Sequence, residues 1–160
     1  KSQKASPMRQ WGATQRQATS SMKQYYRQNI TTLKSHRKGN IDYRFNVEFA
    51  SRIEAALDYM QQNEPDLYDR FQFTDGFREE NRYGASDSMH KYGAAFDFNY
   101  SSYDCNEREK VYYIFAKYGI ACPLNTWNGQ DEGMHMEPAA TYYDGVYRAI
   151  VTEEDEILPG

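Results

Sequence analysis

The chain has 160 residues, a formal net charge of −4 and 39% hydrophobic residues, with 15 Tyr and 8 Phe. This length suffices for one domain around a single core, which we expect to be rich in aromatic side chains. The longest apolar run, Val111–Ala116, is far too short to cross a membrane. The two cysteines, Cys105 and Cys122, are too few for a disulfide scaffold and lack the spacing of a Cys-based metal site, so we interpret them as partly buried thiols.

Charge divides the chain into two parts. Residues 1–40 contain nine Lys or Arg and no acid, whereas residues 41–160 carry 10 basic and 23 acidic groups. We therefore predict a basic N-terminal arm over 1–40 and a folded domain over 41–160. The arm either packs on the domain or binds an acidic partner such as a viral structural protein. Nucleic acid is an unlikely partner, because no aromatic-interleaved recognition pattern accompanies the charge.

Periodicity predicts the elements in chain order. In the arm, a weak helical pattern runs from Ser20 to Ser35, and His36 after it is interpreted as solvated. The domain is predicted to hold a helix over 46–62 capped by Asn46, a strand within 71–78 that ends in a turn at Asp75-Gly76, a strand within 93–100, a helix over 106–118, a strand over 133–138 and another near Val146–Val151. This order favours an α+β domain with a small, mostly antiparallel sheet and packed helices.

Three side chains of the domain have the chemistry of a zinc site. Its two histidines, His90 and His135, lie beside carboxylates in glycine-flanked segments, and Asp97 lies on the polar side of an alternating segment. A single histidine is more often a satisfied surface or core residue. Two histidines with an aspartate point instead to zinc, which binds imidazole nitrogen and carboxylate oxygen and keeps a fourth position for water in catalytic sites. The same ligand set also accommodates other divalent metals.

The stretch Ser88-Met-His90-Lys-Tyr-Gly93-Ala-Ala95-Phe-Asp97 resembles the SxHxxGxAxD signature of the M15 family of zinc peptidases. That family contains D-Ala-D-Ala carboxypeptidases, D,D-dipeptidases and phage L-alanyl-D-glutamate endopeptidases. The segment Glu132-Gly-Met-His135 is similar to the second half of the family's site. Thr74-Asp75-Gly76-Phe77-Arg78 is similar to its SGYR-like segment, with Asp where Ser is common. The resemblance covers residues 46–138.

The resemblance implies a DD-peptidase or hedgehog-like zinc peptidase fold and assigns roles. It implies His90, Asp97 and His135 as ligands of Zn²⁺. It implies Glu132 as the general base and acid, and Arg78 as the group that binds a substrate oxygen. These roles agree with the chemistry, because amide hydrolysis needs a group that moves a proton and a cation where negative charge develops.

Other residues have both a functional and a structural interpretation. Ser88 can hydrogen-bond a ligand or substrate, and Glu137 can orient a ligand or form a surface salt bridge. Tyr92 and Trp127 can line a peptide cleft or pack in the core or at its rim. Gly93 is expected to permit a tight turn or a positive φ between the ligands.

We therefore expect a zinc metallopeptidase that hydrolyses an amide bond in the peptide stem or cross-link of bacterial peptidoglycan, with endopeptidase activity favoured. No secretory signal with an apolar centre is visible at the start of the chain. Together with the resemblance to the family, this favours a bacteriophage lysin or a virion-associated lytic protein. Such a protein is carried by the virion or released from the host cytoplasm to the cell wall. The alternative is a non-catalytic zinc-binding module of a viral or cell-wall assembly, anchored by the basic arm.

Overall fold

A computed structural model describes residues 19–39, 43–78, 88–122, 126–127, 130–131 and 133–139. Its elements are α2 (Ser20–Arg27), β1 (Ile30–Thr32), β2 (Arg44–Asn46), α3 (Val47–Asn63), α4 (Pro65–Arg70), β3 (Phe73–Asp75), the 3-10 helices η1 (Met89–Tyr92) and η2 (Tyr100–Ser102), β4 (Phe96–Phe98), α5 (Cys105–Lys117), β5 (Ile120–Ala121), β6 (Thr126–Trp127), β7 (Gln130–Asp131) and β8 (His135–Pro138). Within these ranges, no helix has the length and apolar character needed to cross a membrane.

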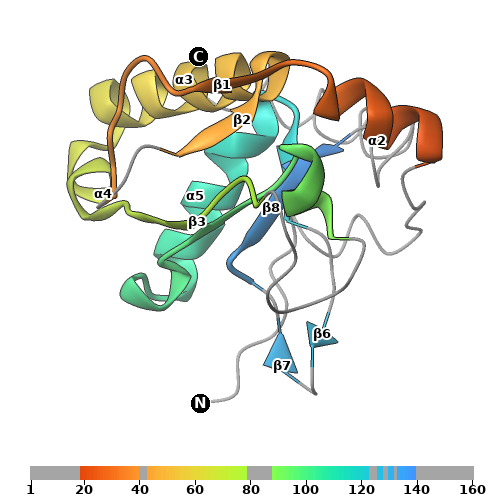
Figure 1. The fold of residues 1–160 in the computed structure, drawn as a ribbon. Coiled ribbons are helices and arrows are strands. Elements are labelled where there is room, and N and C mark those ends of the chain that lie inside the picture. Colours follow the sequence, from red (N-terminus) through yellow and green to blue (C-terminus); the bar gives the residue numbers. More distant parts are fainter. Residues whose placement is uncertain are drawn as a thin grey trace.

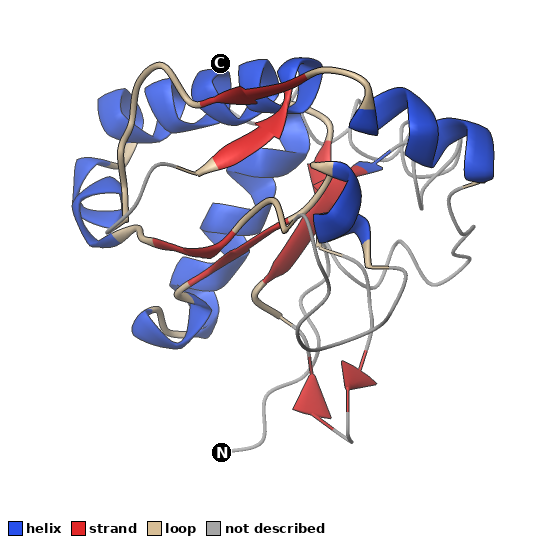
Figure 2. Ribbon diagram, in the orientation of Figure 1, coloured by secondary structure: helices blue, strands red, loops and turns tan. Residues whose placement is uncertain are grey.

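The strands form small antiparallel sheets. The largest has four strands in the order β3-β4-β8-β5, while β1 pairs with β2 and β6 pairs with β7. Every described pairing in the four-stranded sheet is antiparallel. In Figures 1 and 2, α3 runs across the top of the molecule and the strands β3 and β8 lie below it. The prediction of a mixed α+β domain with a small antiparallel sheet is thus confirmed.

Both long helices begin directly after a capping residue, of which Asn46 was predicted. The Asn46 side chain accepts a hydrogen bond from the backbone N–H of Phe49 at 3.0 Å, as expected for an N-cap. Asp104 and Glu107 form a reciprocal capping box at the start of α5. The sequence pattern missed α4, which begins at Pro65 directly after α3, because proline stops one helix but is also favoured in the first turn of the next.

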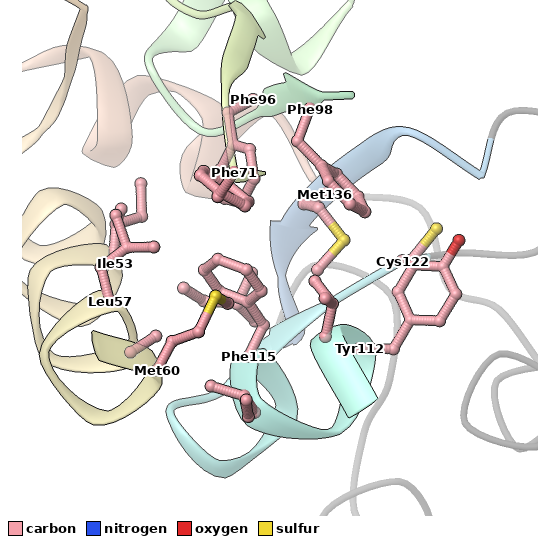
Figure 3. Close-up of a cluster of buried hydrophobic side chains, with 14 of the residues drawn as sticks. Ile53, Leu57, Met60, Phe71, Phe96, Phe98, Tyr112, Phe115, Cys122 and Met136 are labelled. Carbon is pink, nitrogen blue, oxygen red and sulfur yellow. The ribbon is translucent and has the colours of Figure 1, made fainter. Parts of the chain in front are cut away.

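Aromatic side chains fill the core, as their abundance predicts. Phe96 and Phe98 of β4 and Met136 of β8 point toward α3 and α5 (Figure 3). Residue alternation along β4 places these two phenylalanines on one face of the sheet, where both are almost completely buried. Burying a phenylalanine stabilises a fold by about 1.5–3 kcal/mol, so turning this face of the sheet toward the core stabilises the domain.

The N-terminal region differs from its prediction in two ways. The helix ends at Arg27 rather than Ser35, because Ile30–Thr32 pairs with β2 instead. His36 is not solvated: its side chain is 6% exposed, and its ring nitrogens lie 2.7 Å from the Tyr68 hydroxyl and 2.5 Å from Asp58 Oδ1.

Residues 1–18 and 40–42, and the predicted strand near Val146–Val151, lie outside the described residues. The domain boundary at residue 40 therefore stays a prediction.

Candidate metal centre

The second face of the sheet carries polar side chains. Asp97 alternates with Phe96 and Phe98 along β4, so its carboxylate points away from the core. In the antiparallel register Asp97 lies opposite His135 of β8. Facing residues of neighbouring strands approach closely, and this pairing brings one carboxylate and one imidazole together across the sheet.

His90 reaches the same place from η1, a short 3-10 helix that the sequence pattern left inside a loop. Ser88 caps η1, since its hydroxyl accepts a hydrogen bond from the His90 backbone N–H at 3.3 Å. Gly93 ends η1 with φ +68°, which confirms the predicted positive φ. A Cβ at Gly93 would meet the Ile30 side chain and the backbone nitrogen of Asn46, so only glycine fits this tight turn.

The three side chains converge on one point. One potential ligand atom from each of His90, Asp97 and His135 lies within 4.8 Å of the other two. Asp97 Oδ1 lies 3.2 Å from His90 Nε2 and 3.1 Å from His135 Nδ1. Tetrahedral zinc with ligand distances of about 2.0–2.1 Å places its ligand atoms roughly 3.4 Å apart, so both separations fit such an ion. Two imidazoles and a carboxylate are also a donor set that zinc accepts.

In each imidazole, the ring nitrogen that faces away from Asp97 donates a hydrogen bond to an acceptor. His90 Nδ1 donates to the carbonyl oxygen of Gly76 at 2.8 Å, and His135 Nε2 donates to Glu137 Oε2 at 2.6 Å. These bonds leave His90 Nε2 and His135 Nδ1 to face Asp97. Metal-binding histidines commonly donate their second N–H in this way, which fixes both the tautomer and the ring orientation.

Burial and charge shift the ionisation of the cluster. Burial raises the pKa of Asp97, but hydrogen bonds and charge from His135 and His90 outweigh it and hold that pKa well below its usual range. Burial lowers the pKa of His135, but the carboxylates of Asp97 and Glu137 outweigh it and raise that pKa well above its usual range. The metal-free cluster therefore holds a carboxylate ready for a cation and a proton that the cation must displace.

Glu137 lies buried against His135, one of the candidate ligands. Its side chain is 3% exposed, which is incompatible with the alternative of a surface salt bridge. It shares one face of β8 with His135, two residues away, as the alternation of the sequence predicts.

Arg78 lies beside the cluster and contacts one of its members and two neighbouring residues. Its backbone N–H donates to the His90 carbonyl oxygen at 3.1 Å. Its Nη2 lies 3.5 Å from Ser88 Oγ, and its Nε lies 3.4 Å from Asp75 Oδ2. Ser88 thus contacts both a candidate ligand and the candidate substrate-binding cation.

Of the other predicted site residues, the structure describes the side chain of Tyr92 but not those of Trp127 and Glu132. Tyr92 packs against a small cluster of Tyr26, Met89, Ala94 and Ala95, with Lys23 Nζ 5.7 Å from the centre of its ring. This packing agrees with the structural interpretation of Tyr92. Trp127 lies in β6, and its side chain is outside the described part of the chain, as is Glu132 as a whole.

Sequence reasoning missed two contributors to the site. The Gly76 carbonyl oxygen has no side-chain signal, and only the fold shows that His90 donates to it. Asp75 replaces the serine that is common in the SGYR-like segment. This departure is the sequence signal that could have identified it.

The chain matches no family in a scan against models of known protein families. A search of curated proteins likewise finds no match.

Proposed function

We propose that the chain is a zinc metallopeptidase that hydrolyses an amide bond in the peptide stem or cross-link of bacterial peptidoglycan. The convergence of His90, Asp97 and His135, with both imidazoles held by acceptors at their far nitrogens, is the observation that carries the zinc part. The match of residues 88–97 to the SxHxxGxAxD signature supports the peptidase activity and its substrate class. A DD-peptidase or hedgehog-like fold belongs to the same proposal.

The residues divide the chemistry among them. Bound zinc supplies Lewis acidity toward water and the substrate carbonyl. Glu132 accepts the proton of the attacking water and passes it to the leaving amine. Arg78 donates hydrogen bonds to the oxygen on which negative charge develops, and losing such a donor typically lowers the rate by about 10²–10³-fold.

A Glu132→Gln variant separates a peptidase from a non-catalytic zinc module. We expect it to retain one zinc per chain and to lose release of peptides from purified peptidoglycan, because glutamine cannot take up the proton. Turnover that survives in this variant would show that the assigned base is wrong. A wild-type protein that binds zinc but releases nothing from several wall types would favour the binding module.

We also propose that the protein serves as a bacteriophage lysin or a virion-associated lytic protein, with residues 1–40 contacting an acidic viral or wall component. Because α2 packs against η1 and β1 pairs with β2, a test of the arm should remove residues 1–18 only. Loss of virion or wall association with full activity on soluble stem peptides is the expected result. Unchanged association would remove this role from residues 1–18.

A further inference from the structure

A β-bulge brings a second aspartate to the metal cluster. Phe73 of β3 pairs with Phe98, but Asp75 pairs with Asp97, so two residues of β3 span one residue of β4. Without this extra residue, alternation would place Asp75 on the same face as Phe73. Bulges commonly redirect a side chain next to a functional site. Here the bulge turns Asp75 toward the face that carries Asp97.

Asp75 is held in place there. Its Oδ1 accepts a hydrogen bond from the Gly76 N–H at 2.9 Å, and its Oδ2 lies 3.4 Å from Arg78 Nε. The side chains of Asp75 and Arg78 are only 17% and 14% exposed, so solvent screens their interaction weakly. Oδ2 also lies 3.9 Å from His90 Nδ1, on the side of that ring away from Asp97.

The ion pair with Asp75 lowers the net positive charge that Arg78 presents to a substrate. A serine beside Arg78 would leave the guanidinium with its full positive charge, whereas Asp75 offsets that charge. Among the described residues around the cluster, the carboxylates of Asp75, Asp97 and Glu137 offset the charges of a bound divalent cation and of Arg78. An anionic group bound at the guanidinium would lie close to Asp75 and be repelled by it.

We propose that Asp75 is a specificity-determining residue, which makes the site select a neutral carbonyl or carboxamide over a free carboxylate on the residue that follows the cleaved bond. The inference rests on the proposed function and deepens it. The requirement concerns the α-carboxyl of that residue, whether the cleaved bond is internal or lies one residue from a free C-terminus. The charge of Asp75 thereby makes cleavage depend on whether that carboxyl is free or amidated.

The test uses two peptides that differ only in one group. Both are wall-stem peptides with the same cleaved bond, and the residue after that bond carries its α-carboxyl either as the free acid or as the carboxamide. We expect the wild-type protein to have the higher kcat/KM on the carboxamide. In Asp75→Asn, which keeps an oxygen for the Gly76 N–H, the ratio should move toward the free acid by about tenfold, since one nearby negative charge is gone. Asp75→Ser should move it in the same direction.

A matched control removes the same charge from an aspartate–arginine pair elsewhere. Asp66 Oδ2 lies 3.3 Å from Arg70 Nη2, and Asp66→Asn should leave the ratio at its wild-type value. A ratio that is unchanged in both Asp75 variants, or a wild-type preference for the free acid, would overturn the proposal. An equal loss on both peptides would reduce Asp75 to a structural role and also overturn it.

The role of Asp75 can still be tested if the protein turns out not to be a peptidase. Absence of turnover on either peptide would count against the peptidase, not against Asp75. The ratio of Kd values for the two peptides on the zinc-loaded wild-type and Asp75→Asn proteins then replaces the kinetic ratio. A Kd ratio that shifts toward the free acid supports the role of Asp75, and one that does not shift overturns it.

Discussion

The carboxylate of Glu137 accepts a hydrogen bond from His135 Nε2 at 2.6 Å, and both side chains are nearly inaccessible to solvent. The bond joins two residues of one strand that share a face of the sheet. It fixes His135 with Nδ1 toward Asp97 and places a second negative charge behind the imidazole. Both effects favour a cation at the point where His90, Asp97 and His135 converge.

Replacing Glu137 should therefore weaken zinc binding. We expect Glu137→Gln to lower zinc affinity by about 10-fold and Glu137→Ala by up to about 100-fold, because glutamine keeps an acceptor and alanine keeps none. Competition with a chromophoric chelator measures both values. Glu48, whose side chain is about half exposed and which lies 3.6 Å from Arg52, provides the control Glu48→Gln. An affinity equal to that of wild type in Glu137→Ala would contradict the assigned role.

Zinc affinity should depend on pH through His135. The carboxylates around His135 raise its pKa, so in the metal-free protein the ring holds a proton at neutral pH that zinc must displace from Nδ1. Affinity should then fall as the pH falls, by about tenfold per pH unit for this proton alone. Asp97 adds no further loss there, because its pKa is lowered.

Calorimetric titrations of zinc in buffers of different ionisation enthalpy count the protons released. We expect at least one proton per zinc between pH 6 and 8, and fewer from Glu137→Gln, because that change removes one of the carboxylates that raise the pKa of His135. Affinity that is constant across this range would show that His135 carries no such proton.

Gly93 and Gly119 allow a matched test of the turn that holds His90. Both have positive φ, +68° and +73°, so alanine should cost about 1 kcal/mol of stability at either position. At Gly93 the new Cβ would also lie 2.9 Å from the Asn46 backbone nitrogen, whereas at Gly119 it would meet only the movable end of Arg52.

Thermal unfolding should therefore show a larger loss of stability for Gly93→Ala than for Gly119→Ala. Only the Gly93 variant should also bind zinc more weakly, since η1 carries a candidate ligand. Equal losses of stability, or normal zinc affinity in Gly93→Ala, would argue that the turn does not position His90.

Local patterns in the sequence predicted the parts of the fold that local physics controls. Asn46 caps the start of α3, as its side chain predicts. Alternation along β4 places Asp97 on one face of the sheet and its flanking phenylalanines on the other. The same alternation puts His135 and Glu137 on one face of β8. The residues that converge on the candidate metal centre were therefore visible in the sequence.

The parts that were missed depend on contacts between distant segments. The helical pattern after Arg27 gives way to β1 because β2 offers a strand partner, and no local signal reports that pairing. His36 looked solvated among basic neighbours, but Tyr68 and Asp58 come from helices far along the chain. Asp75 reaches the cluster only through a bulge, which breaks the period-2 rule used to assign faces.

Digestion of purified peptidoglycan, with the released fragments identified by mass spectrometry, tests the central claim most directly. The reaction is run with the native protein, after chelation, and after zinc is restored. New peptide termini that disappear with the chelator and return with zinc are the predicted result, and their identity names the bond that is cut. A protein that binds one zinc through His90, Asp97 and His135 yet releases no new termini from any wall type would contradict the assignment as a peptidase.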